Sequence, residues 1–165
     1  MSLTIVLLTD LHYSKQTNES NPDRAGEWAN LLLLRAVHRI NRYIKPDVTI
    51  LAGDLIDQPD AHDAFKLLAE LKSITDKLDM PLIAIPGNHD PDPEAFYSVF
   101  KRPDDFIDIG NCRILPFLDK ETPGYNAFRS PEDIARLRQL GSEFDGPVIT
   151  VQHVPVFPSD ACDCP

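Results

Sequence analysis

Four short polar stretches carry residue types that could do chemistry, and each of them follows a run of apolar residues. Residues 10–12 read Asp-Leu-His, residues 53–57 read Gly-Asp-Leu-Ile-Asp, and residues 87–90 read Gly-Asn-His-Asp. The last stretch is Gln152-His153, after a fourth apolar run. A tight turn explains a glycine or an asparagine, because both tolerate unusual backbone angles, but it gives no reason for the histidines. We therefore expect these stretches to be parts of one site.

The residue types indicate a metal-dependent reaction. Imidazole and carboxylate groups together suit Mn, Fe, Zn or related divalent ions. One carboxylate can bridge two ions about 3.5–4 Å apart, and such a pair can hold the attacking and leaving oxygens of a phosphoryl displacement. A water molecule between such ions loses its proton far more readily than bulk water does. The reaction therefore needs no serine or cysteine nucleophile.

Each stretch, taken singly, also has a simpler structural explanation. Asp10 could be a turn residue, Gly53-Asp54 could begin a loop, and a lone histidine at a strand end is more often a hydrogen-bonded structural residue. A coincidence of ligand-type residues after all four apolar runs is the weaker explanation of the set. His38 lies within a helical pattern and His62 near the start of another, so we assign structural roles to both.

The apolar runs predict the elements that must position these residues. Strand-like runs occupy residues 3–8, 48–52, 82–85 and 148–151, and apolar residues at helical spacing occupy 28–44 and 61–78. In the first half, strand and helix alternate, which predicts β-α-β units and a mostly parallel sheet with helices on its faces. The carboxyl ends of parallel strands meet at one edge, where such folds place ligands. Asp10 and His12 would share one face of an extended segment.

The second half of the chain predicts a different pattern. Residues 105–109 and 112–117 flank Gly110-Asn111, a pair typical of a β-hairpin turn. Ser130-Pro131 predicts a helix start, with serine as the cap and proline in the first turn. That helix should run to about Leu140, with Gly141 as its stop. Further upstream, Pro91 and Pro93 should end regular structure after the Gly-Asn-His-Asp stretch.

Length and charge bound the function classes. The 165 residues suit a single domain, residues 1–165, with a real core. With 26 acidic against 16 basic residues the net charge is -10, which argues against a nucleic-acid-binding surface that works by neutralising phosphates. No stretch approaches the roughly 20 apolar residues of a membrane span, and no signal peptide is evident. We expect a cytoplasmic protein, unless a native signal peptide has been removed.

The three cysteines do not make a disulfide framework in a chain of this size. Cys162 and Cys164 form a weak metal-binding pattern, and incidental thiols near the chain end are the simpler explanation.

Taken in order, the polar motifs resemble those of the calcineurin-like metallophosphoesterase family. The family pattern is D-x-H, G-D-x-x-D, G-N-H-[DE], a further His, and then G-H-x-H. The matches here are residues 10–12, 53–57 and 87–90 and His153. The resemblance implies an α/β fold, an αββα sandwich of mixed sheets flanked by helices. It also implies hydrolysis of phosphoric esters at a dinuclear centre of Mn, Fe or Zn.

The resemblance further implies a role for each matching residue. The metal ligands would be Asp10 and His12 on the first ion, Asp54 bridging both ions, and Asn88 and His153 on the second. Asp57 would hold nearby ligands in place. His89 would protonate the leaving oxygen or stabilise charge on the phosphoryl group, and Asp90 would orient His89. The nucleophile would be the metal-bound hydroxide, attacking in line without a covalent phospho-enzyme.

Two departures from the family pattern bear on this picture. Gln58 stands where Ser/Thr protein phosphatases carry arginine, and the third motif ends in Asp90 rather than glutamate, so the chain looks more similar to the phosphodiesterase and small-substrate phosphohydrolase branch. The G-H-x-H motif is absent, since only twelve residues follow His153 and none is histidine. We expect a domain truncated at its C-terminus. The alternatives are a degenerate member with weakened metal binding and a partner that supplies the missing ligands.

A competing function from another class is a non-catalytic or weakly active domain that binds metal or phosphate through an incomplete site. For the enzyme, we expect a small phosphoester substrate, with the polar loops 13–27 and 118–131 lining its cleft, because loops after strand ends usually carry specificity. Lys15 and Arg24 could meet a phosphate there, although solvent exposure is the simpler expectation for both. The sequence leaves the oligomeric state open.

Overall fold

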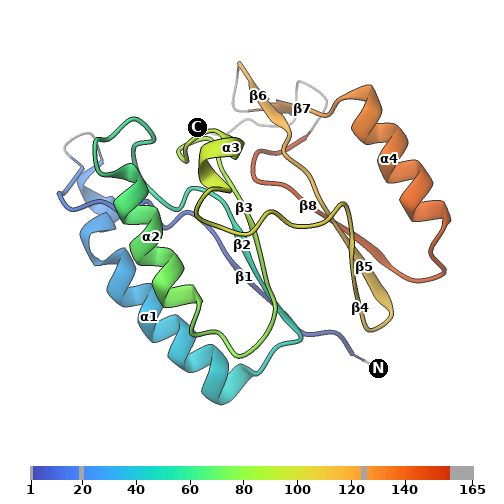
Figure 1. Cartoon of the computed structure of the whole chain (residues 1–165), viewed down its shortest axis with the longest axis horizontal. Helices are drawn as coiled ribbons and strands as arrows, with labels where there is room; N and C mark the ends of the chain where they lie inside the picture. Colours follow the sequence, from blue (N-terminus) through green and yellow to red (C-terminus); the bar gives the residue numbers. More distant parts are fainter. Residues whose placement is uncertain (1, 19–20, 124–125, 157–165) are drawn as a thin grey trace.

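The computed structural model describes residues 2–18, 21–123 and 126–156 of the chain. Two β-sheets pack face to face, and helices lie on the outer side of each sheet, so the layers run α, β, β, α (Figure 1). The predicted α/β class, with an αββα sandwich of mixed sheets, is confirmed.

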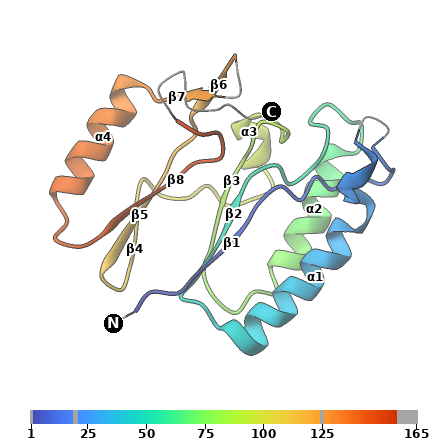
Figure 2. The ribbon, with the colours of Figure 1, turned by 180° about the vertical axis from the view of Figure 1, so that it is seen from behind.

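The first sheet consists of three parallel strands, β1 (Ile5–Leu8), β2 (Val48–Ala52) and β3 (Leu82–Ile85), in that spatial order. Two helices, α1 (Ala29–Arg39) and α2 (Ala64–Thr75), lie side by side on its outer face (Figure 2). Parallel pairing with helical crossovers brings the carboxyl ends of all three strands to one edge of the sheet.

The second sheet has the order β4-β5-β8, with β4 (Ile107–Ile109) antiparallel to β5 (Cys112–Pro116) and β8 (Val148–Val151) parallel to it. The helix α4 (Pro131–Ser142) lies on the far side of this sheet from the first (Figure 1). Arg113 on β5 donates to the Leu140 carbonyl oxygen of α4 at 3.0 Å, which ties the helix to the sheet.

Strand β2 lies between the two halves of the core, and all five of its residues are buried. Val48 and Ile50 pack with Ile114 and Val151 of the second sheet. Leu51 points the other way and packs with the residues of α1 and α2. The alternation follows from the two-residue repeat of a strand, and burial on both faces explains why β2 reads as one continuous apolar run.

Several predicted elements are confirmed. The strands predicted at 48–52, 82–85 and 148–151 have the bounds of β2, β3 and β8. The hairpin of β4 and β5 turns at Gly110, whose φ is 62°. The helix predicted over 28–44 is α1 continued by a π-helical turn, Ile40–Ile44.

Other predictions about the elements are wrong. The predicted loop 118–131 contains an antiparallel pair, β6 (Lys120–Thr122) and β7 (Asn126–Phe128). These strands have only three residues each, too few to show a repeat, and the backbone N–H of Ala127 bonds the Pro155 carbonyl oxygen at 2.9 Å, a contact from distant sequence. The helix predicted over 61–78 is shorter, since α2 covers Ala64–Thr75.

Two breaker residues do not break the structure. Pro93 begins the short helix α3 (Pro93–Phe96), because the Asp92 carboxylate caps it by accepting from Glu94 N and Ala95 N at 3.0 and 3.1 Å. Gly141 lies within α4 rather than ending it. A glycine in a helix costs about 1 kcal/mol, a small penalty one residue before the end of the helix.

The helices in the described ranges are all too short or too polar to reach across a lipid bilayer.

The packing between the sheets predicts a large stability effect at Ile50, which is 2% exposed. Ile50→Ala should lower the free energy of unfolding by about 2–5 kcal/mol, because truncation leaves a cavity between two sheets that cannot collapse. Chemical denaturation measures the change. Ile134→Ala on the outer side of α4, where the side chain is 38% exposed, is the matched control and should change stability by less than about 0.5 kcal/mol. Equal effects at both positions would contradict the packing described.

Candidate metal centre

Three of the four polar stretches follow the parallel strands of the first sheet, and the fourth crosses from the second sheet. Asp10 and His12 follow β1, Asp54 follows β2, and Asn88 follows β3. His153 follows β8, and its ring reaches the first sheet, where Nδ1 lies 2.6 Å from the Ala52 carbonyl oxygen. The structure therefore brings all four stretches to one place, although only three of them share a sheet.

The backbone after β1 runs along the backbone after β2, although neither continues as a regular strand. Asp10 N donates to the Gly53 carbonyl oxygen at 3.0 Å, and His12 N donates to that of Asp54 at 2.9 Å. Asp10, His12 and Asp54 have φ angles of 57°, 43° and 53°. Residues other than glycine rarely adopt this left-handed backbone region, and each one costs on the order of 1–3 kcal/mol of conformational strain. The predicted extended segment at 10–12 is therefore wrong, and strained backbone turns these side chains toward the cleft instead.

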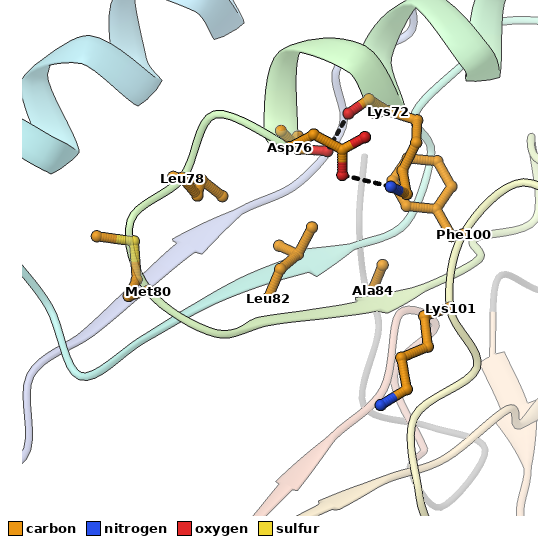
Figure 3. Close-up of a pocket in the computed structure, with 9 residues that line it drawn as sticks. Lys72, Asp76, Leu78, Met80, Leu82, Ala84, Phe100 and Lys101 are labelled. Atoms are coloured by element: carbon orange, nitrogen blue, oxygen red, sulfur yellow. Dashed lines mark hydrogen bonds and ion pairs between the residues drawn. The ribbon is translucent and has the colours of Figure 1, made fainter.

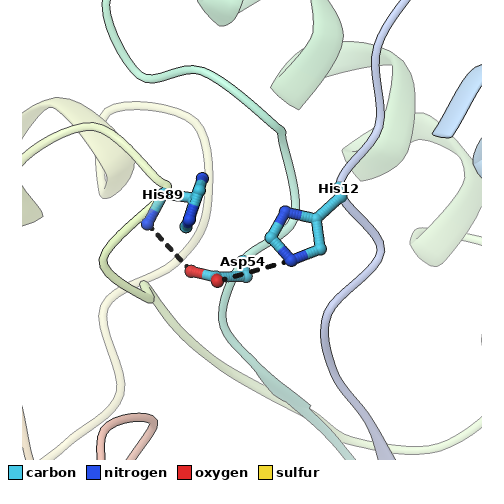
Figure 4. A group of neighbouring side chains, drawn as sticks. All are labelled: His12, Asp54 and His89. Atoms are coloured by element: carbon cyan, nitrogen blue, oxygen red, sulfur yellow. Dashed lines mark hydrogen bonds and ion pairs between the residues drawn. The ribbon is translucent and has the colours of Figure 1, made fainter. Parts of the chain in front are cut away.

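Asp54 lies at the centre of the cluster and is 4% exposed. Its Oδ1 accepts from His89 N at 2.8 Å, and its Oδ2 lies 3.6 Å from His12 Nε2 (Figure 4). The same Oδ1 lies 3.2 Å from Nε2 of His153. Burial raises the pKa of Asp54, but the hydrogen bonds from His153 and from the His89 backbone outweigh burial and leave the pKa below its usual value. The buried carboxyl group therefore stays negative at neutral pH.

An oxygen atom lies beside Nδ1 of each of the three clustered histidines. Ala52 O is 2.6 Å from Nδ1 of His153, and Asp57 O is 2.8 Å from Nδ1 of His89. Asp57 Oδ1 lies 3.5 Å from Nδ1 of His12. A carbonyl oxygen only accepts, so Nδ1 of His153 and of His89 carries a proton, and Nε2 is the atom left for a metal ion or a substrate.

The pKa values of two of these histidines move in opposite directions. The hydrogen bond to Asp54 raises the pKa of His153 to about 9, against the opposing effect of burial. Burial, followed by the charge of Arg24, lowers the pKa of His12. His12 is thus held neutral, which is the form that binds metal, and His153 shares its proton with Asp54.

The cluster contains two groups of ligand atoms that lie within 4.8 Å of one another, and both groups include Asp54. One group is His12, Asp54 and His89, and the other is Asp10, Asp54 and His153. Asn88 Oδ1 lies 3.1 Å from His153 Nε2, so its amide oxygen borders the second group. Carboxylate, imidazole and amide oxygen donors around one buried carboxylate fit a divalent ion such as Mn, Fe or Zn.

Asp57 and Asp90 lie behind this cluster. Asp57 is 6% exposed and accepts from Arg24 Nη1 at 2.8 Å and from Asn18 Nδ2 at 2.6 Å. The hydrogen bonds of the Asp90 carboxylate in the described ranges go to backbone N–H groups of Leu55, Ile56 and Gly87. The expected contact in which Asp90 orients His89 is therefore corrected, because the His89 ring is held by the Asp57 carbonyl oxygen.

The carboxyl group of Asp90 has a raised pKa. Burial raises its pKa to about 6, although the three backbone donors lower it. The contact of Asp90 with Gly87 N lies at the start of the turn that carries His89.

The sequence does not predict that Arg24 belongs to the cleft. Arg24, expected to be solvated, is paired with Asp57 and lines a cleft of about 510 Å³ with Asp10, His12 and Asp54. No spacing rule reveals this, because the contact spans 33 residues. Lys15 pairs instead with Glu70 on α2. Glu121 of the predicted second loop also borders the cleft.

The remaining candidates lie elsewhere. His38 is exposed on α1, and His62 borders a separate hollow beside α2. Cys162 and Cys164 lie outside the described residues. A further cavity of about 220 Å³ lies between the end of α2 and the start of β3 (Figure 3). Its walls mix apolar and polar side chains, and its Lys72 and Asp76 pair with each other. It lies at the opposite end of β3 from Asn88.

Comparison with known proteins agrees with the donor set. A family model described as calcineurin-like phosphoesterase matches residues 3–163, which is nearly the whole chain. No curated protein matches the chain.

The close approach of two loops predicts that Gly87 cannot carry a side chain. A Cβ at Gly87 would lie 2.2 Å from Asp54 Oδ1, whereas a Cβ at Gly141 would meet nothing within 4 Å. Gly87→Ala should therefore displace Asp54 and weaken Mn²⁺ binding at least about tenfold, since misplaced ligands and their supports cost 10- to 100-fold in affinity. Titration calorimetry on chelator-treated protein measures this.

Gly141→Ala is the matched control. It should leave Mn²⁺ binding unchanged and raise stability by up to about 1 kcal/mol through helix propensity. Native Mn²⁺ affinity in Gly87→Ala would contradict the geometry described for Asp54.

Proposed function

The chain belongs to the calcineurin-like phosphoesterase family, and from this premise we propose that it hydrolyses phosphoesters at a centre of two divalent metal ions. The observation that carries the proposal is the position of Asp54. It is buried, negative and common to two groups of ligand atoms. A carboxylate in that position is suited to bridge two ions.

The proposed ligands divide between the two ions as the family motifs imply. Asp10 and His12, whose Oδ1 and Nε2 lie 3.8 Å apart, bind the first ion, Asn88 and His153 bind the second, and Asp54 binds both. The clustered ligand atoms are also close in another combination, with His89 beside His12 and Asp10 beside His153. Ions bound there would polarise the phosphoryl group and activate the attacking water, as Mn, Fe and Zn can do. The Ala52 carbonyl oxygen supports this assignment, because it keeps the proton on Nδ1 of His153 and turns Nε2 toward Asn88 and Asp54.

His89 is proposed as the proton donor to the leaving oxygen. Its Nδ1–H is held by the Asp57 carbonyl oxygen at 2.8 Å, so the imidazolium form would donate from Nε2. The ring lies edge-on to that of His12, with 4.8 Å between ring centroids, which keeps it beside the ligands (Figure 4). Its Nε2 is also close enough to the cluster to bind an ion, and measurement of metal binding separates these two roles.

The proposed substrates are small phosphodiesters or phosphomonoesters, because the cleft is about 510 Å³ and open at the ends of the strands. Residues on both predicted specificity loops border it, namely Arg24 on the first and Glu121 on the second. This supports a role for these loops in substrate choice.

A second candidate function rests on the number of ligands. In the described part of the chain each proposed ion receives three protein ligands, with Asp54 counted for both. A site with so few ligands fits a domain that binds metal or phosphate weakly without turnover. Metal content and turnover, measured on the same sample, distinguish this candidate from the enzyme.

Removal of the bridging charge should lower both metal binding and turnover. We expect Asp54→Asn to lower Mn²⁺-dependent hydrolysis of bis(p-nitrophenyl) phosphate by at least about 1000-fold, because the amide carries no charge to hold two ions together. The same variant should bind fewer Mn²⁺ ions by elemental analysis.

Asp79→Asn controls for the loss of a carboxylate, since Asp79 is exposed before β3, at the other end of the sheet. It should behave like the unchanged protein. Hydrolysis that survives both chelation and Asp54→Asn would rule out the proposed mechanism.

Substitution of His89 should separate proton transfer from metal binding. We expect His89→Gln to lower kcat by about 100- to 10,000-fold, the usual contribution of a general acid, while Mn²⁺ stoichiometry stays unchanged. The loss should be smaller for an ester whose leaving group needs no proton, such as p-nitrophenolate, than for an alkyl ester. A fall in Mn²⁺ stoichiometry would show instead that His89 is a metal ligand.

A further inference from the structure

Arg24 lies at the edge of the metal cleft, and we propose that its guanidinium group binds a negatively charged phosphoryl oxygen of the substrate. The proposal rests on the phosphoester hydrolysis proposed above and adds an anion-binding residue to it. Arg24 ends the 3-10 turn Pro22–Arg24, in the segment between β1 and α1. It borders the same cleft as His12 and Asp54.

The charges around the cleft single out this residue. Among the described residues that line it, Arg24 is the sole lysine or arginine, whereas Asp10, Asp54 and Glu121 are acidic. A substrate with charged phosphoryl oxygens would enter a mostly negative cleft on a protein of net charge -10. A guanidinium group stays charged throughout the pH range of folded proteins. Arg24 therefore provides a fixed positive charge for such oxygens.

The hydrogen bonds of Arg24 leave one edge of its guanidinium group available. Nη1 donates to Asp57 Oδ1 at 2.8 Å and lies 3.4 Å from His12 Nδ1. Within the described ranges, Nε and Nη2 of Arg24 make no hydrogen bond. Neither atom is among the buried polar atoms that lack a partner, so both are accessible to solvent. The side chain is 29% exposed. The Nε–Nη2 edge thus presents parallel N–H donors to accessible space, the arrangement that binds two phosphoryl oxygens at once.

Arg24 is also held in place before any ligand arrives. Its partner Asp57 has a side chain that is 5% exposed, and Asn18 Nδ2 donates to the other Asp57 oxygen at 2.6 Å. Two residues further on, Gly26 packs so closely that a Cβ there would lie 2.3 Å from the His12 carbonyl oxygen. The loop is therefore fixed against the metal ligands, and binding costs little ordering of the arginine.

Arg24 could instead serve only to hold Asp57, and equilibrium binding distinguishes the two roles. The probe is inorganic phosphate, titrated calorimetrically into Mn²⁺-loaded protein, with Mn²⁺ affinity measured separately. We expect Arg24→Gln to weaken phosphate binding roughly 10- to 100-fold, as loss of charge-assisted hydrogen bonds does, while Mn²⁺ affinity changes less than about threefold. Arg24→Lys should restore only part of the affinity, because an ammonium group cannot form the two parallel bonds.

Two further variants complete the test. Asn18→Ala removes another side-chain donor to Asp57 but keeps the positive charge, so it should weaken phosphate binding less than Arg24→Gln does. Arg39→Gln removes an exposed arginine from α1 and should keep native phosphate affinity. Phosphate affinity that is unchanged in Arg24→Gln overturns the proposal. So does a parallel fall in Mn²⁺ affinity that Asn18→Ala reproduces, or an absence of phosphate binding to the unchanged protein.

Phosphate binding is read out without turnover. A specific loss in Arg24→Gln would therefore support the role of Arg24 even if the unchanged protein hydrolysed no ester, a result that counts against the proposed function alone.

Discussion

One buried carboxylate, that of Asp90, joins the two loops on which the cluster depends. Its Oδ1 accepts from Leu55 N and Ile56 N at 2.9 and 3.1 Å, and its Oδ2 accepts from Gly87 N at 2.9 Å. Leu55 directly follows Asp54, and Gly87 directly precedes Asn88. The carboxylate therefore fixes the end of β2 relative to the end of β3, and a buried N–H group left without it would cost about 1–3 kcal/mol.

The loops that Asp90 joins approach each other at the distance of backbone contact. A Cβ at Gly53 would lie 2.5 Å from Gly87 N, and Gly53 has a φ of 93° that favours glycine. This approach allows His89 N to reach Asp54 and leaves room for the ring of His153 from the second sheet. The two glycines are thus requirements of the cluster, and the strain at Asp54 is retained because both loops hold it.

The electrostatics of the site follow from the same arrangement. Asp10, Asp54, Asp57 and Asp90 lie within a few residues of the strand ends, and three of them are buried. A histidine ring, backbone N–H groups and Arg24 satisfy the three buried carboxylates, and the Thr9 hydroxyl donates to Asp10. Buried carboxylates ordered in this way favour the approach of cations, and Arg24 is the basic residue among the described residues that line the same cleft. The proposed metal site and the proposed phosphoryl-binding arginine would thus be neighbouring parts of one cleft.

The sequence by itself determined the buried strands and the residue types of the cluster, because burial on both faces and helical repeats leave strong apolar patterns. It also indicated Asp10, His12, Asp54, Asn88 and His153, since each follows such a run. The order of the layers followed only from the resemblance of the polar motifs to a known family. Only the tertiary structure decided what touches what. The pairing of Arg24 with Asp57 and the contact of His89 with the Asp57 carbonyl oxygen join segments more than 30 residues apart. The β6–β7 pair lies against Pro155 for the same reason. Such contacts depend on where loops meet in space, and local residue patterns carry no information about that.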